Sequence, residues 1–107
     1  MVSCAAAVET WDARRILILF MVVERFKRGT ALVEERFKRD GRMLPEDVTY
    51  VASWMEMDGL RCFQLMEAPS RQALAPWMAR WSDLVEFEVS EVKTSAEFWS
   101  KAESGDA

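Results

Sequence analysis

Hydrophobic residues recur along the chain with two different periods, and the order of these periods predicts the fold. The apolar run from Ile16 to Val23 has the length of a strand that is buried on both faces. Val33 and Phe37 then stand four residues apart among charged residues, a spacing typical of an amphipathic helix. We expect this helix to begin at Thr30 and to end at Gly41.

The middle of the chain predicts a hairpin followed by a second helix. Residues 49–56 and 61–67 are strands by composition, and Asp58-Gly59 between them is a turn signal. Large apolar residues then recur with helical spacing at Leu74, Trp77, Met78 and Trp81. Pro76 lies inside this segment, and we expect it either to kink the helix or to mark where its regular part begins.

The last strand is the clearest one in the sequence. Over Leu84 to Ser90, apolar and polar residues alternate, with Val85, Phe87 and Val89 on one face. Thr94 and Glu97 then form a capping box, which begins a short terminal helix. This helix carries Phe98 and Trp99, and we expect one of them to pack on its own chain and the other at a dimer interface.

The order strand, helix, strand, strand, helix, strand predicts the ferredoxin-like α+β fold, with a four-stranded antiparallel sheet. We assign residues 1–15 to an N-terminal tail, 16–93 to this domain, and 94–107 to the terminal helix and tail. Both helices cover the same face of such a sheet, which leaves the other face open. We expect a second copy to cover it, because two-fold homodimers are the commonest oligomers.

Composition excludes several classes of function. The chain has 107 residues, enough for one domain, and no histidine. Ser-His-Asp and Cys-His catalysis, His-ligated haem and most zinc sites are therefore excluded, and we expect neither a metal nor a cofactor. Cys4 and Cys62 form no CxxC motif, which favours a reducing cytoplasm. No apolar run approaches the ~20 residues of a membrane helix.

Several motifs of the chain resemble a known family. They are Phe20-Met-Val-Val-Glu-Arg-Phe26, Gly41-Arg-Met-Leu-Pro45, Ser53-Trp54, Arg61-Cys-Phe-Gln-Leu-Met-Glu67, Trp77, Trp81 and Asp83-Leu-Val-Glu-Phe-Glu88. From Leu19 to Thr94, the sequence resembles a bacterial family of small proteins of unknown function within the dimeric α/β-barrel group of ferredoxin-like folds. The resemblance implies this fold and a homodimer. Related families include cofactor-free monooxygenases and haem enzymes with an axial histidine, which this chain lacks.

Five residues form the candidate ligand pocket. Glu86 and Glu88 alternate with the apolar face of the last strand, so we expect them on the open face of the sheet. By the same parity, we place Gln64 with them, and the hairpin partner adds Tyr50 and Trp54. Such a set would line a small-molecule pocket, in which buried carboxylates transfer protons. The alternative is an edge strand whose polar face is in water, and the sequence identifies no catalytic residue.

A repeated basic motif is the other unusual feature. Glu24-Arg-Phe-Lys-Arg28 recurs as Glu35-Arg-Phe-Lys-Arg39, and residues 1–42 hold 9 basic and 6 acidic groups. Basic residues interleaved with an aromatic can bind single-stranded nucleic acid. A solvated surface is the interpretation that we favour, because the chain as a whole has a net charge of −4.

These observations lead to three functional hypotheses. The first is a homodimer that binds a small molecule, either between the sheet and the helices or within the barrel. The second is a cofactor-free, monooxygenase-like enzyme or another enzyme that acts on a small substrate. The third is a protein-interaction module that uses the basic surface from Arg25 to Arg42.

Overall fold

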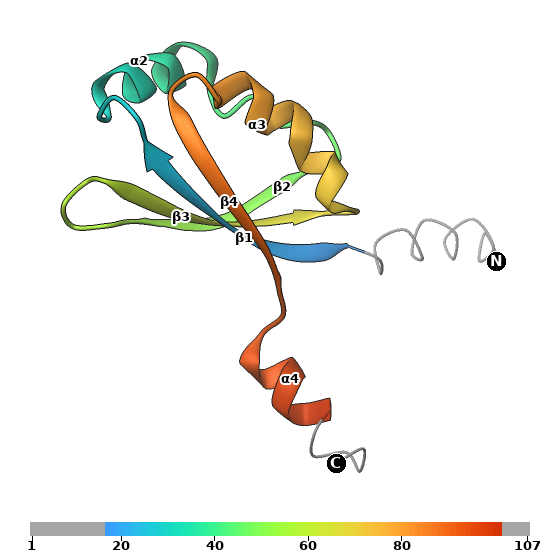
Figure 1. The fold of residues 1–107 in the computed structure, drawn as a ribbon. Helices are drawn as coiled ribbons and strands as arrows, with labels where there is room; N and C mark the ends of the chain where they lie inside the picture. The colour runs from blue at the N-terminus through green and yellow to red at the C-terminus, as the bar shows by residue number, and fades with distance from the viewer. Residues whose placement is uncertain (1–16, 102–107) are drawn as a thin grey trace.

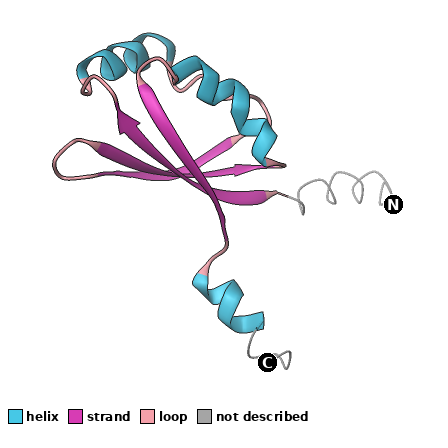
Figure 2. Cartoon of the chain, in the orientation of Figure 1, coloured by secondary structure: helices cyan, strands magenta, loops and turns pink. Residues whose placement is uncertain are grey.

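The computed structural model describes residues 17–101 and has the predicted α+β architecture (Figure 1, Figure 2). The tail expected over residues 1–15 lies outside the described residues. The strands are β1 (Ile18–Phe26), β2 (Thr49–Met55), β3 (Arg61–Ala68) and β4 (Val85–Val92). The helical segments are α2 (Ala31–Asp40), the 3-10 helix η1 (Arg71–Leu74), α3 (Ala75–Trp81) and α4 (Ser95–Lys101). The strand order β2-β3-β1-β4, antiparallel throughout, confirms the ferredoxin-like βαββαβ fold.

The helices are arranged in two places. Figure 1 shows α2 and α3 together on one side of the sheet, which we call the helix face, and α4 beyond the end of β4, away from both. Neither α2 nor α3 lies on the other side of the sheet, which we call the open face. None of the helices in residues 17–101 is long and apolar enough to span a membrane.

The core lies between α3 and the helix face. Trp77 and Trp81 on α3 are buried against Phe20 and Val22 of β1, and the Trp77 ring meets Phe87 edge-on at a centroid distance of 5.2 Å. Pro76 lies in the first turn of α3, where its missing N–H removes no helical hydrogen bond. The second of the two roles expected for Pro76 is therefore confirmed.

By contrast, α2 has no buried residue. Its apolar stripe consists of Val33, which is half-buried, and Phe37, which is 43% exposed. A bidentate pair holds the helix instead, because Arg36 donates hydrogen bonds of 2.9 and 2.8 Å to the Asp83 carboxylate. Arg36 also donates to the carbonyl of Arg80 at 2.9 Å, so that α2 is tied to the last turn of α3 and to the turn that follows it.

The register between strands assigns each residue to a face. Val22 lies opposite Gln64 on β3 and opposite Val89 on β4, so that these three share the helix face. Val23 lies opposite Phe63 and Glu88, so that this row shares the open face. The placement of Gln64 beside Glu88, expected from alternation alone, is therefore wrong.

A β-bulge interrupts β2. The pairing with β3 skips Val51, so that Tyr50 lies opposite Met66 while Ser53 lies opposite Gln64. The extra residue reverses the alternation, so that Trp54 lies on the open face and is 55% exposed. The expectation that Tyr50 and Trp54 share one face is therefore also wrong.

The open face is only partly buried in the single chain. Leu19, Met21 and Val23 of β1 are half-buried there, next to Phe63 and Leu65 of β3. The strand expected to be buried on both faces is thus fully buried on the helix face alone.

The terminal helix also remains exposed. Thr94 and Glu97 form the expected capping box, in which the Glu97 N–H donates to Thr94 Oγ1 at 3.0 Å. Phe98 is 53% and Trp99 61% exposed, and the centroids of the two rings lie 5.0 Å apart. The expectation that one of them packs on its own chain is wrong.

Candidate functional site

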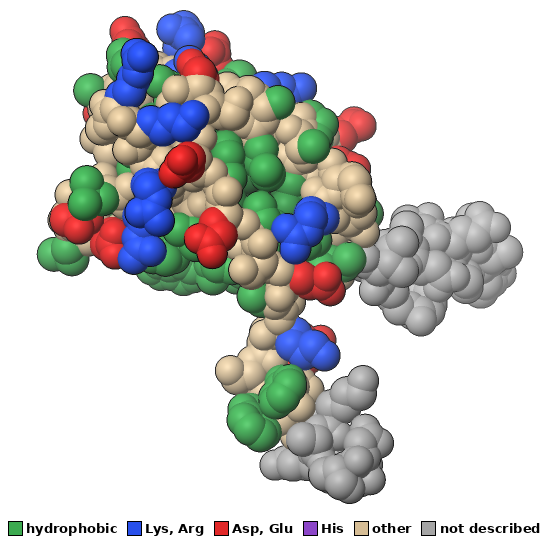
Figure 3. Space-filling view, viewed as in Figure 1, with side chains coloured by type: hydrophobic (Ala, Val, Ile, Leu, Met, Phe, Trp, Pro, Cys, Tyr) green, Lys and Arg blue, Asp and Glu red, His purple; other side chains and the backbone are tan. Residues whose placement is uncertain are grey.

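A cavity of about 620 Å³ lies between α2 and the helix face. Figure 3 shows apolar side chains in a hollow between the helix layer and the sheet, with charged side chains around it. The apolar walls include Phe37 from α2, Trp77 and Trp81 from α3, and Cys62 and Val85 from the sheet. The cavity exists because α2 contributes only a narrow apolar stripe, which does not fill the space that the sheet leaves below it.

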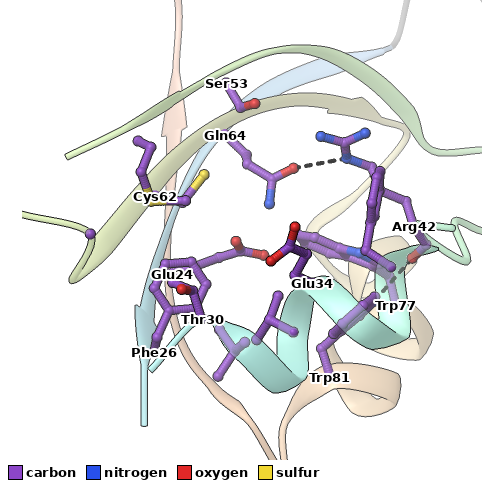
Figure 4. Close-up of a pocket in the computed structure, with 15 residues that line it drawn as sticks. Glu24, Phe26, Thr30, Glu34, Arg42, Ser53, Cys62, Gln64, Trp77 and Trp81 are labelled. Carbon is purple, nitrogen blue, oxygen red and sulfur yellow. Dashed lines mark hydrogen bonds between the residues drawn. The ribbon is translucent and has the colours of Figure 1, made fainter. Parts of the chain in front are cut away.

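Polar side chains line the sheet wall of this cavity. Glu24 on β1 is 8% and Gln64 on β3 5% exposed, and both point to the helix face. Figure 4 shows these two side chains close to Arg42, with Glu34 reaching toward Glu24 from α2. We call Glu24, Gln64 and Arg42 the polar row.

Burial controls the charge of Glu24. Loss of water around the carboxylate raises its pKa above the ordinary value of 4.5. A hydrogen bond with Gln64 and the positive charge of Arg42 act in the opposite direction without cancelling this rise. Glu24 is therefore a buried carboxyl group that takes up a proton more readily than an exposed glutamate does.

Arg42 follows α2 in the connection to β2, and several contacts fix it. Its Nε donates to Gln64 Oε1 at 3.2 Å, as the dashed line in Figure 4 marks. Its guanidinium carbon lies 3.7 Å from the centroid of the Tyr50 ring, in cation–π contact. Its backbone carbonyl accepts a hydrogen bond of 3.0 Å from the Trp81 indole. Side chain and backbone are thus both held against the sheet and α3.

Ser53 and Cys62 complete the sheet wall of the cavity. The hydroxyls of Tyr50 and Ser53 are hydrogen-bonded at 2.7 Å, a contact that the bulge in β2 makes possible by placing both on the helix face. Burial and the nearby Glu24 raise the pKa of the Cys62 thiol to about 11. Cys62 is therefore a neutral thiol that packs as a small apolar group.

The five predicted pocket residues divide between the two faces. Gln64 lines the cavity beneath α2, and Tyr50 supports Arg42. Trp54, Glu86 and Glu88 lie on the open face. There, Glu86 Oε1 lies 3.7 Å from Nε of Arg25, and both glutamates border a smaller hollow of about 250 Å³.

Sequence reasoning missed Glu24 and Arg42 as site residues. Glu24 continues the alternation of Phe20 and Val22, which would have placed it on the buried face. Arg42 has no comparable signal, because it lies in an irregular connection whose path depends on contacts with α3.

The charged residues offer no cluster for a metal ion. Within residues 17–101, no group of three or more His, Cys, Asp or Glu side chains is close enough to hold one. The polar row contains one carboxylate, one amide and one guanidinium, and the guanidinium repels cations.

A family model described as a domain of unknown function, DUF3303, matches residues 18–105. The chain belongs to this family. No curated protein matches the chain, and no solved structure matches it either. Because the DUF3303 description names no activity, the function has to be argued from the site itself.

Proposed function

We propose that this DUF3303 protein binds a small molecule in the cavity beneath α2. The observation that carries the proposal is the polar row on one wall of a cavity of about 620 Å³ whose other walls are mostly apolar. Ligand sites typically have this volume and this combination of apolar walls with a few fixed polar groups.

The cost of the polar row supports the same proposal. Burying Glu24 and Gln64 on a sheet face costs free energy that leucine or methionine would not cost. The space beneath α2 likewise forfeits packing that a wider apolar stripe on the helix would supply. A ligand that fills the cavity and bonds to the row would offset both losses.

A matched pair of α2 variants tests the proposal. Val33 lines the cavity, whereas its neighbour Leu32 does not and is exposed. We expect Val33→Trp to fill the cavity and to weaken the binding of small aromatic molecules by about tenfold or more. Leu32→Trp should leave binding unchanged. Ligand-observed NMR with naphthalene derivatives measures both, and equal binding by both variants would contradict the proposal.

We further propose that two copies associate through the open face. Its half-buried apolar residues Met21, Val23 and Leu65 support this, since such a surface gains from being covered. Trp54, Glu86 and Glu88 would then lie at or near the dimer contact. The family resemblance and the free thiol of Cys62 support a bacterial, cytoplasmic setting.

Sedimentation equilibrium tests the dimer. Met21→Glu places a charge in the middle of the open face, so we expect it to shift a dimer to monomer at micromolar concentration. Ala79→Glu, on the exposed side of α3, is the control and should leave the dimer intact. A wild-type protein that sediments as a folded monomer would contradict this part of the proposal.

Catalysis in the same cavity is a second candidate function. It is favoured by Glu24, since burial raises its pKa above that of an exposed glutamate and it faces the cavity that Arg42 also lines. A substrate identified by binding would then be tested for turnover. Glu24→Gln keeps the shape of the side chain but cannot accept a proton, so it should abolish turnover while substrate still binds.

A further inference from the structure

The proposed cavity is lined by one arginine, Arg42. Arg25, Arg36, Arg39 and Arg61 each lie within 4.0 Å of a carboxylate. No carboxylate of the described residues lies that close to Arg42, although its side chain is half-buried and lines the cavity. The other described arginines without such a partner, Arg28, Arg71 and Arg80, are exposed and lie outside the cavity.

The contacts of Arg42 fix its guanidinium and leave the two terminal nitrogens available for a ligand. Nε is used by Gln64, and the face of the group lies on the Tyr50 ring. Among the described residues, neither terminal nitrogen of the guanidinium has a hydrogen-bond partner. A planar guanidinium held in this way binds a planar carboxylate through two parallel hydrogen bonds, with little further loss of side-chain entropy.

Resting on the proposed binding function, we propose that the ligand is an aromatic or alicyclic monocarboxylate, whose carboxylate binds Arg42 and whose ring occupies the apolar part of the cavity. Trp77, Trp81 and Phe37 provide the apolar surface for the ring. The cavity has one arginine and two glutamates, Glu24 and Glu34, so it suits a single negative charge better than a phosphate dianion.

Glu24 is compatible with a bound carboxylate because burial favours its neutral form. Its pKa is already raised by burial, and a ligand carboxylate nearby would raise it further. Protonated Glu24 then presents an O–H donor to the ligand rather than a second negative charge. Glu34 is exposed and pairs with Lys38, whose Nζ lies 3.3 Å from its Oε2 and offsets part of its charge.

Three probes with the same ring and different charge test the proposal on the wild-type protein. They are 2-naphthoate, 2-naphthalenemethanol and 2-naphthylmethylammonium, with dissociation constants measured by calorimetry at pH 7. We expect 2-naphthoate to bind about tenfold or more tightly than the neutral alcohol, and the ammonium compound to bind most weakly. This ranking requires no variant and therefore does not depend on the folding of a mutant.

Variants then assign the preference to Arg42. Arg42→Gln should bring 2-naphthoate to within about threefold of the alcohol, whose own affinity stays nearly unchanged. Arg42→Lys should retain part of the preference, because it keeps the charge but not the bidentate geometry. The control Arg28→Gln makes the same charge change at an exposed site and should have no effect on any probe.

The failures of the two proposals are distinguishable. If none of the three probes binds, both the cavity function and the carboxylate proposal are overturned. If the probes bind but the alcohol or the ammonium compound binds as tightly as 2-naphthoate, only the carboxylate proposal is overturned. The same conclusion follows if Arg42→Gln leaves the preference for 2-naphthoate intact.

Discussion

The two helices on the sheet, α2 and α3, cover it by different means. The seven residues of α3 include two buried tryptophans, and its N-terminus follows the buried Leu74. The ten residues of α2 include no buried residue, and a bidentate arginine–aspartate pair fixes the helix. Helix α3 therefore packs in the core, whereas α2 covers a cavity. The tight packing and the space of the proposed binding site thus lie under different helices of the same layer.

The largest expected effect comes from truncating the packed helix. Trp77→Ala should lower the free energy of unfolding by about 3–5 kcal/mol, because it empties the centre of the core. Phe37→Ala on α2 should cost less than about 1 kcal/mol, since that ring is largely exposed. Urea unfolding measures both. Losses of similar size would mean that the two helices do not differ in the way described.

Breaking the ion pair should loosen α2 while α3 stays protected. With Asp83→Asn, the Arg36 guanidinium loses its charged partner, so amide hydrogen exchange should speed up across α2 and change little in α3. Asp40→Asn, at the end of the same helix, is the control for loss of a carboxylate. Uniformly faster exchange in both helices would contradict a local role.

Acid should break the same pair in the wild-type protein. Arg36 lowers the pKa of Asp83 from 3.8 to about 2. A lowered pKa means that the stabilisation is complete above pH 3.8 and is lost as the pH falls toward 2. We therefore expect exchange in α2 to accelerate over this interval relative to Asp83→Asn, in which the transition should be absent.

The contribution of Glu24 to stability should depend on pH in the opposite direction to that of Asp83. Its folded-state pKa is raised, so the folded protein holds this proton more tightly than the unfolded chain does. Its contribution to stability is therefore complete below about pH 4.5 and is lost as the pH rises above that value. Glu24→Gln should remove this decline, a smaller effect than that of Trp77→Ala. Denaturant midpoints measured at several pH values would contradict the assignment if both proteins gave the same profile.

The smallest effect on the single chain should come from α4. Removing residues 94–107 deletes two exposed aromatic side chains, so the monomer should lose little stability. If these rings contact a second copy, the dimer dissociation constant should nevertheless rise. Sedimentation of the truncated protein at several concentrations measures this. Glu97→Ala is the control, because it removes only the side-chain oxygen that accepts from the Thr94 N–H in the capping box. An unchanged dissociation constant would show that α4 takes no part in association.

The fold could be predicted because periodicity and turn signals report on local structure. The alternation in β4, the Asp58-Gly59 turn and the Thr94–Glu97 capping box each identify an element without knowledge of the others. The strand order then follows from connection rules that leave few alternatives.

The candidate site was harder to predict, because it depends on how separate elements are aligned. Alternation relates residues within one strand, but the register that places Gln64 beside Val22 comes from pairing between strands. No signal in the sequence marks the bulge at Val51, which places Tyr50 and Trp54 on opposite faces of the sheet. The position of Arg42 likewise depends on a contact with Trp81, which is 39 residues away along the chain.

The contact between Trp81 and the connection that carries Arg42 has a thermodynamic consequence. Trp81 holds the carbonyl of Arg42, and Arg80 donates to the carbonyl of the next residue, Met43. A molecule bound at Arg42 would therefore contact a segment that is held to α3, the helix that packs in the core. Occupancy should raise the melting temperature of the entire domain, and at 100 times the dissociation constant the gain is about 2.7 kcal/mol. A thermal-shift screen of carboxylic acids can thus identify ligands of the cavity without an assay of activity.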